Sequence, residues 1–376
     1  MSSKGKMIEK PVRKQMQQLL DTLVRNGDER GLQLAVYHHG ELVVDAWAGT
    51  ADSATGRAVT PETLFPIFSA GKAIAATLAH LLVQRGQVSY DTRIASLWPE
   101  FAAHGKQDIT LGHALSHTAG LPFMPMGIAC REIVDWQTMC DAIAQLSPIA
   151  PAGQRQIYHA VTYSWLVGEV IRRVTGCPFS QVLQEEICRP LHLSSMFIGM
   201  PPELEDRVAV LEESFAPDKE PSADDSRPQA IPGWMWPLHD WANRPDIRHA
   251  CIPASNGVMS ARSMARHYAA LVPGGVNGIE LLPPSRIHQA TQQRTPTSPA
   301  PEDSAMGMSL GYFLGGPDCE MGSRITAFGH GGYGGSTGFA DPEQRLAVGF
   351  TKNRFADNGT VRKVLCQVRD ALGIPQ

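Results

Sequence analysis

Strand-like segments occur near both ends of the chain, and helix-like segments fill the middle. Residues 31–49 contain two runs rich in strand-forming residues on either side of His39 and Gly40, which predicts a hairpin. The other expected strands lie late in the chain, at about 310–315, 324–329, 336–341 and 345–351. The spacing of apolar residues predicts helices at 8–26, 69–85, 131–146, 160–175, 179–189, 261–272 and 357–371.

This order of segments favours a three-layer α+β fold, in which both chain ends build one antiparallel β-sheet flanked by helices. A mainly helical subdomain is then inserted at about residues 81–255, and the α/β part comprises about 1–80 and 256–376. Because 43% of the 376 residues are hydrophobic, the chain can bury a sizeable core. We therefore expect a single domain over residues 1–376.

The charge and hydropathy patterns exclude several classes of protein. The formal net charge is −4, and no run of Lys or Arg indicates a nucleic-acid partner. No segment reaches the roughly 18 consecutive apolar residues of a membrane span, and no apolar region follows the basic N-terminal stretch as in a secretory signal. Seven separated cysteines without a C-x-x-C motif favour a reduced, cytoplasmic protein without structural zinc. Nothing in the sequence indicates an oligomeric state.

One apolar segment, residues 64–82, contains a single charged residue, Lys72, within the motif Ser69-Ala70-Gly71-Lys72. Residues three apart share a face of a helix, so the serine hydroxyl and the lysine amine can meet. Burial disfavours the charged form of lysine, and a neutral lysine can take the proton of a serine nucleophile. The alternative is a helix-capping serine next to a lysine that extends to solvent. A second S-x-x-K match at residues 3–6 lies in a polar tail and is discarded.

Two further segments carry candidate residues. Tyr158 precedes an amphipathic segment, and a cation near it would lower the pKa of its phenol, so that it shares the base role with Lys72. Taken alone, Tyr158 is typical of a core tyrosine. In His330-Gly331-Gly332, the glycines allow a strand edge to approach the nucleophile and to supply an N–H to a developing oxyanion.

Together and in this order, these motifs resemble the serine β-lactamase and penicillin-binding superfamily. The likeness is greatest to its esterase-like branch, the family VIII carboxylesterases and β-lactamase-related acyl hydrolases. It is carried by SAGK at 69–72, the Tyr158 segment and HGG at 330–332, and residues 111–122 and 338–354 also resemble this family.

The resemblance covers roughly residues 30–370 and implies an active site between the sheet and the helical subdomain. It implies that Ser69 is acylated, and that Lys72 and Tyr158 activate Ser69 and later the incoming water or alcohol. The backbone N–H groups of Ser69 and Tyr333 would form the oxyanion hole. The substrate would be a small-molecule ester, amide or lactone, and we expect no cofactor and no metal ion.

Two departures from the family pattern favour an esterase over a lactamase. His330 stands where lactamases usually carry the lysine of a K-T-G element, so the cation that would bind a β-lactam carboxylate is missing. Ala160 replaces the asparagine common two residues after the tyrosine. Acyl transfer, D-amino-acid peptidase activity and β-lactamase activity remain alternatives, and so does a catalytically inactive ligand-binding protein on the same fold.

The residues expected to contact substrate are His330, Gly331, Gly332 and three tryptophans. An acidic, proline-rich stretch at 201–228 leads into these tryptophans, which are Trp234, Trp236 and Trp241. Because long loops are usually functional or disordered, and tryptophans argue against disorder, we expect this segment to wall the substrate pocket. A packed surface excursion is the alternative.

Two other motifs are rejected. Residues 334–338 match the G-x-S-x-G elbow around Ser336, but a strand-like run follows it and no histidine occurs after His330. His113 and His117 have the spacing of a metal-binding pair, but there is no H-E-x-x-H motif and no evident third ligand. A capped or packed helix explains the two histidines better.

Overall fold

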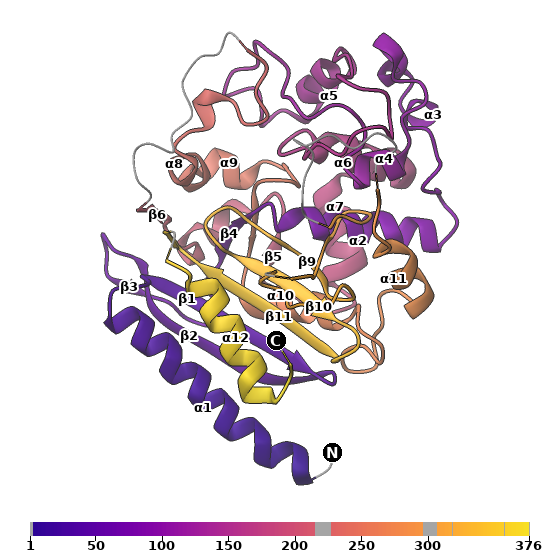
Figure 1. Ribbon diagram of the computed structural model, residues 1–376. Coiled ribbons are helices and arrows are strands. Elements are labelled where there is room, and N and C mark those ends of the chain that lie inside the picture. The colour runs from indigo at the N-terminus through magenta and orange to yellow at the C-terminus, as the bar shows by residue number, and fades with distance from the viewer. Residues whose placement is uncertain (1–2, 215–226, 296–306, 318, 357, 376) are drawn as a thin grey trace.

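The computed structural model describes residues 3–214, 227–295, 307–317, 319–356 and 358–375, with side chains from residue 11 onward. Its centre is a seven-stranded sheet with the strand order β3-β2-β1-β11-β10-β9-β8 (Figure 1). The strands are β1 (Gly31–His38), β2 (Glu41–Asp52), β3 (Arg57–Ala58), β8 (Phe313–Leu314), β9 (Phe328–Gly331), β10 (Thr337–Asp341) and β11 (Leu346–Lys352). All neighbouring strands are antiparallel. Because β1 pairs with β11, both chain ends build one sheet, as predicted.

The predicted hairpin is the β1–β2 connection. His39 and Gly40 both have positive φ, at 53° and 80°, which matches the right-handed twist of two strands joined by a two-residue turn. Every residue of β1 from Gly31 to Tyr37 is buried, so this strand is covered on both faces of the sheet. The sheet therefore needs a layer of helices on each side.

Helices α1 (Ser3–Arg25) and α12 (Thr360–Leu372) cover one face of the sheet (Figure 1). Met16 and Val364 belong to the same buried cluster as Val348 of β11. Helix α10 (Ala261–Ala269) covers the other face and approaches it closely, because a Cβ on Gly349 would lie 2.3 Å from the carbonyl oxygen of Ala261. These layers confirm the α+β fold.

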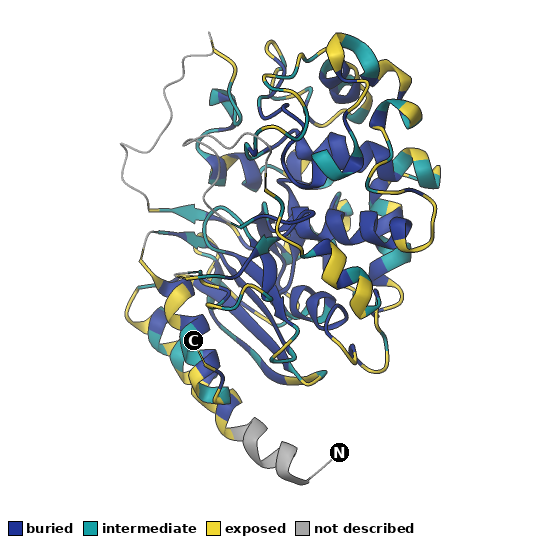
Figure 2. Ribbon diagram, turned by 45° about the vertical axis from the view of Figure 1, so that its right-hand side comes forward, coloured by how far each residue is buried: buried dark blue, intermediate teal, exposed yellow. Residues whose placement is uncertain are grey.

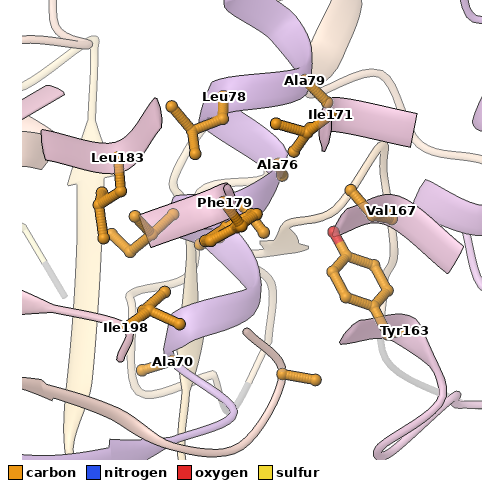
Figure 3. Packing of buried hydrophobic residues seen from close by; sticks show 14 of the residues in the cluster. Ala70, Ala76, Leu78, Ala79, Tyr163, Val167, Ile171, Phe179, Leu183 and Ile198 are labelled. Carbon is orange, nitrogen blue, oxygen red and sulfur yellow. The ribbon is translucent and has the colours of Figure 1, made fainter. Parts of the chain in front are cut away.

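Most of the remaining helices form a second region beside the sheet (Figure 1). They are α2 (Gly71–Gln84), α3 (Ile94–Leu97), α4 (Leu111–Leu115), α5 (Trp136–Ala144), α6 (Tyr163–Thr175), α7 (Phe179–Leu183), α8 (Leu238–Asn243), α9 (Pro245–His249) and α11 (Pro284–Ala290). Helix α2 is at the centre of this region, and every residue from Gly71 to Val83 is buried (Figure 2). Side chains of α6 and α7, among them Val167, Ile171 and Phe179, gather around it (Figure 3). Complete burial explains why its sequence is apolar on all sides.

Several predicted boundaries differ from the structure. The helix expected at 131–146 begins at Trp136, where the Asp135 side chain caps it by accepting a hydrogen bond from the Thr138 N–H. The helix expected at 160–175 begins at Tyr163, which leaves Tyr158 in the preceding loop. Residues 179–189 form α7 followed by a π-helical turn, Gln184–Cys188. Residues 215–226 of the acidic stretch and residue 357 of the last helix lie outside the described residues.

Short strands that the sequence did not indicate hold the segment leading to Ser69. Strand β4 (Phe65–Phe68) lies in a three-stranded sheet of order β4-β7-β5, with β7 (Gly257–Met259) and β5 (Met196–Phe197). A parallel pair joins β6 (Glu212–Glu213) to β12 (Arg354–Phe355).

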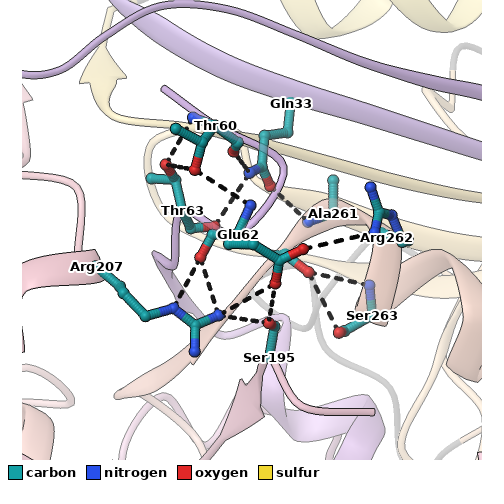
Figure 4. A network of polar contacts seen from close by, with 10 residues as sticks. Gln33, Thr60, Glu62, Thr63, Ser195, Arg207, Ala261, Arg262 and Ser263 are labelled. Carbon is teal, nitrogen blue, oxygen red and sulfur yellow. Dashed lines mark hydrogen bonds and ion pairs between the residues drawn. The ribbon is translucent and has the colours of Figure 1, made fainter. Parts of the chain in front are cut away.

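A polar network anchors the residues before β4 (Figure 4). The buried Gln33 amide donates to the carbonyl oxygens of Thr60, at 2.7 Å, and Thr63, at 3.1 Å. Its oxygen accepts from the N–H of Ala261, at 2.9 Å, the first residue of α10. Arg207 adds hydrogen bonds to the carbonyl of Glu62 and the hydroxyl of Ser195. The network joins the main sheet, α10 and the strand that ends next to Ser69.

All seven cysteines lie in the described part of the chain, and none is in a disulfide. Among the described helices, none is both long enough and apolar enough to cross a membrane.

Candidate active site

The chain turns sharply between β4 and α2, and Ser69 lies at this turn. Phe68 has φ of +47°, a left-handed conformation that non-glycine residues adopt rarely and that often marks functional sites. Gly71 begins α2, and a Cβ there would lie 2.6 Å from the carbonyl oxygen of Pro253. The turn places the half-buried Ser69 hydroxyl at the start of a buried helix, with Lys72 one helical turn further on.

The Lys72 amine is fully buried and makes three hydrogen bonds. Two go to the backbone carbonyl oxygens of Ala160, at 2.7 Å, and Ala254, at 3.0 Å. The third joins Nζ to the Oγ of Ser69 at 3.0 Å. None of these partners carries a negative charge, and burial holds the pKa of Lys72 well below its usual value. A neutral amine has two N–H groups for the carbonyls and one lone pair, which then faces the serine hydroxyl.

Lys106 provides a contrast within the same chain. It is also buried, but its amine contacts three backbone carbonyl oxygens, those of Ala103 at 2.6 Å, Ala144 at 2.9 Å and Leu146. Three carbonyl acceptors match the three N–H groups of an ammonium ion. Burial lowers the pKa of Lys106 only to about 8, so it stays mostly protonated at neutral pH. Lys72 differs from Lys106 in that one of its three hydrogen-bond partners is the Ser69 hydroxyl and not a carbonyl.

Tyr158 lies beside both groups, in the loop before α6. Its side chain shares a hydrogen bond with Ser69, and the Nζ of Lys72 is 4.8 Å from the centre of its ring. The expected lowering of the Tyr158 pKa is wrong: burial raises it above the usual value, although the hydrogen bond with Ser69 opposes this. The physical reason is that burial disfavours the charged phenolate more strongly than the hydrogen bond with Ser69 stabilises it. Tyr158 therefore remains a phenol with a proton to donate.

The HGG segment lies at the end of β9, against the turn that carries Ser69. A Cβ on Gly332 would lie 1.9 Å from the carbonyl oxygen of Ile67 and 3.4 Å from the nitrogen of Ala70, so only glycine allows this approach. The Nδ1 of His330 donates to the carbonyl of Gly331 at 2.6 Å. Burial, followed by the proximity of Lys72, lowers the pKa of His330 to about 3. His330 is thus neutral and supplies no cation at neutral pH.

A cavity of about 950 Å³ opens beside these residues, and Ser69, Tyr158 and His330 line it. Most of the described residues that line the cavity are apolar, and Glu320 is the only charged side chain among them. The apolar lining includes Val161, Ile231, Met235, Leu238, Met308, Phe313 and Leu314. Such a cavity accommodates an uncharged, apolar ligand.

The structure corrects the expectation that tryptophans wall this cavity. Ile231, Met235 and Leu238 come from the expected segment and line the cavity, whereas Trp234 lines a separate hollow of about 380 Å³. Trp236 packs against the edge of Tyr333, and Trp241 is buried in the core. The physical reason is local: Met235 lies in a short helical turn, Gly233–Met235, which directs neighbouring side chains to different sides.

The rejected motifs have structural roles. The Nδ1 of His113 accepts from the N–H of Thr110, which completes a capping box at α4. The Nδ1 of His117 accepts from the N–H of His159 at 3.0 Å. Among the described residues, no cluster of three or more histidine, cysteine or acidic side chains could hold a metal ion. Ser336 is buried outside the cavity lining, and a strand follows it.

Other contacts at the site carried no sequence signal. The ring centre of Phe313 lies 5.9 Å from that of Tyr158 and 4.2 Å from that of His330, and the ring centre of His117 lies 4.7 Å from that of Tyr158. These rings pack around Tyr158, which also lines the cavity.

The fold, with a serine hydroxyl next to a desolvated lysine at an apolar cavity, defines a serine hydrolase of the β-lactamase type. The sequence profile of the Beta-lactamase family matches residues 16–372, and the chain belongs to this family.

Comparison with known proteins places the chain near esterases and penicillin-binding proteins. Esterase/beta-lactamase LipL of Mycobacterium tuberculosis is 32% identical over 338 residues, which cover 86% of this chain and 77% of the relative. The crystal structure of a family VIII carboxylesterase matches this chain with a TM-score of 0.85 at 29% identity, and the match covers 96% of this chain and 98% of the esterase chain. A penicillin-binding protein homologue from Caulobacter crescentus has a TM-score of 0.81 at 31% identity, over 95% and 96% of the two chains.

Proposed function

We propose that this serine hydrolase is a carboxylesterase that cleaves neutral esters with small or medium apolar acyl groups through an acyl-enzyme on Ser69. The observation that carries the proposal is the contact between the Ser69 hydroxyl and an amine whose other partners are the carbonyls of Ala160 and Ala254. This arrangement holds a base in hydrogen-bond reach of a nucleophile.

In the acylation step, Lys72 takes the proton of the Ser69 hydroxyl while Oγ attacks the ester carbonyl carbon. The backbone N–H groups of Ser69 and Tyr333 donate to the oxyanion that develops. Tyr158 gives its proton to the leaving alcohol oxygen as the C–O bond breaks. The proton held by Lys72 then replaces the one lost by Tyr158, so the pair is restored before water enters.

In the deacylation step, the same pair acts on water. Lys72 removes one proton from the water as the water oxygen attacks the acyl carbon. Tyr158 gives its proton to the Oγ of Ser69 as the bond between Oγ and the acyl carbon breaks. An alcohol in place of water would give acyl transfer by the same sequence of steps. The elevated pKa of Tyr158 supports its part as a proton donor in both steps.

The charges around the cavity support an ester as the substrate over a β-lactam. His330 is neutral, and the only charged side chain in the described lining, Glu320, would repel a carboxylate. The likeness to a family VIII carboxylesterase agrees with this, whereas the name of the LipL relative includes both activities. A β-lactam is therefore the second candidate substrate.

The test compares p-nitrophenyl butyrate with a chromogenic cephalosporin under the same conditions. We expect ester turnover with kcat/KM about 100-fold or more above that for the cephalosporin, since an unpaired carboxylate in an apolar site is strongly disfavoured. Faster cephalosporin cleavage would assign the protein to the lactamases. The absence of turnover with both substrates would favour a ligand-binding protein.

A further inference from the structure

The hydroxyl of Tyr333 contacts a carboxylate outside the cavity. Tyr333 follows the HGG segment and lines the cavity, and its hydroxyl donates to Oε1 of Glu213 at 2.6 Å. Glu213 lies in the short strand β6, which pairs with β12, and only 13% of its side chain is exposed. A nearly buried carboxylate makes a strong hydrogen bond, so the position of the Tyr333 side chain is well defined.

The second oxygen of the same carboxylate contacts the cavity wall. Oε2 of Glu213 lies 2.8 Å from Nδ1 of His239. His239 follows Leu238, the first residue of α8 and part of the cavity lining. The Glu213 carboxylate therefore joins the turn after β9 to helix α8, whose first residue lines the cavity.

Aromatic side chains hold the rest of the Tyr333 ring. The ring centres of Phe68, Trp236 and Phe355 lie 5.7, 5.8 and 5.5 Å from the centre of the Tyr333 ring, each in an edge-to-face arrangement. Phe68 directly precedes Ser69, so the ring packs against the turn that carries the nucleophile. A phenylalanine at position 333 would keep these ring contacts and lose the bond from its hydroxyl to Glu213.

We propose that Glu213 is a positioning residue: through the Tyr333 hydroxyl it fixes the backbone N–H of Tyr333, and through His239 it couples that N–H to the wall around the acyl group. This inference rests on the proposed function, in which that N–H stabilises the oxyanion. An oxyanion donor must lie within a narrow distance range, and removal of one donor costs about 10²- to 10³-fold in kcat. Loss of the hydrogen bond between Tyr333 and Glu213 displaces the oxyanion donor without removing it, so its effect on kcat is smaller.

The neighbouring Glu212 provides a matched control. It lies on the same strand, but its carboxylate accepts from Ser53 and from Arg30, at 3.2 Å for Arg30, and makes neither of the contacts of Glu213. Successive side chains of a strand point to opposite sides, which explains the difference. Glu212→Ala therefore removes a carboxylate from the same strand, as Glu213→Ala does, without affecting the contacts of Glu213 with Tyr333 and His239.

The experiment measures kcat and KM of the full chain with p-nitrophenyl acetate and p-nitrophenyl butyrate. Glu213→Ala and Tyr333→Phe should each lower kcat by about 10-fold for both esters with little change in KM for the acetate, because only the transition state uses the N–H. The double variant should be no slower than either single variant. Glu213→Gln should retain most of kcat because its side-chain oxygen accepts the same hydrogen, and Glu212→Ala should match the wild type.

Two outcomes overturn the inference while the proposed function stands: unchanged kcat in Tyr333→Phe, or losses in the two single variants that multiply in the double variant. A wild-type chain without ester turnover contradicts the proposed function itself. If Glu213→Ala fails to fold, the comparison of Tyr333→Phe with Glu213→Gln still decides, because both retain the shape of the original side chain.

Discussion

The Nζ atom of Lys72 lies 3.0 Å from the Oγ of Ser69, and its two other hydrogen bonds end on backbone carbonyls. Lys106 is also buried, but all three of its hydrogen bonds end on carbonyls. Both lysines fix local structure, yet only Lys72 faces a group from which a neutral amine can take a proton. Substitutions of the two lysines can therefore distinguish a catalytic role from a structural one.

Replacement of Lys72 by methionine should lower kcat/KM by about 10³-fold, within the range for loss of a general base. Lys72→Arg should be equally inactive, because a guanidinium does not lose its proton at any relevant pH. Lys106→Met should retain kcat and show a lower melting temperature, since it leaves three carbonyls without their donor. Comparable activity losses in Lys72→Met and Lys106→Met, both corrected for folded protein, would argue against the assignment.

The pH dependence of kcat/KM should report the protonation of Lys72. Burial lowers the Lys72 pKa well below its usual value, and the active form is neutral, so activity should rise with pH through that lowered pKa and then level off. The raised pKa of Tyr158 keeps its phenol protonated across the plateau. Initial rates between about pH 5 and pH 10, corrected for spontaneous hydrolysis, measure this profile. Activity that appears only near the ordinary pKa of lysine would contradict a desolvated base.

The acyl preference should depend on Met235 and Leu238, which line the cavity, and not on Trp234, which lines a separate hollow. Leu238→Ala should shift the preference toward longer acyl chains by removing bulk from the wall, whereas Leu238→Trp should shorten it. Kinetics with a p-nitrophenyl ester series from acetate to decanoate provides the measurement. Trp234→Ala is the control, and a shift in that variant equal to the one in Leu238→Ala would place the acyl group elsewhere.

Acid should destabilise the fold through buried neutral histidines. Burial lowers the pKa values of His80, His267 and His330 to about 3 and of His159 to about 4, and it holds that of His117 well below 6.5. Because these folded-state values lie below the unfolded value near 6.5, the stabilisation is complete above pH 6.5 and decreases as the pH falls toward 4. At pH 5 the loss approaches about 2 kcal/mol for a buried histidine whose folded-state pKa is about 3 or 4.

Urea unfolding at pH 7 and pH 5 measures this change directly. The free energy of unfolding should fall by several kcal/mol between the two values, a range that lies above the usual pKa of carboxyl groups. Equal stability at pH 7 and pH 5 would show that these histidines are not buried as neutral rings.

Local patterns in the sequence predicted the elements whose form depends on local chemistry. Helix α2 was recognisable because its segment is apolar with one lysine, and the β1–β2 hairpin because turn-forming residues separate two strand-like runs. The S-x-x-K spacing on a helix also predicted that Ser69 and Lys72 would meet. Short strands such as β4 and β7 were not predicted, since two to four residues carry too little periodicity.

The remaining features of the site depend on contacts between distant parts of the chain. The carbonyls that bind Lys72 lie 88 and 182 residues away, and a backbone carbonyl has no sequence signature. The tryptophans indicated the correct segment, but a short helical turn directs Met235 into the cavity instead. The sequence did not indicate Glu213, because it lies in an acidic stretch beside Glu212, and the two carboxylates differ only in the side of the strand to which they point.

The role of Ser69 as the nucleophile is tested most directly by covalent labelling with a serine-directed phosphonate, with the labelled residue identified by intact mass and peptide mapping. We expect one adduct on the peptide with Ser69, loss of both label and ester turnover in Ser69→Ala, and retention of both in Ser336→Ala. Label on another serine, or a Ser69→Ala variant that still turns over ester, would contradict this role.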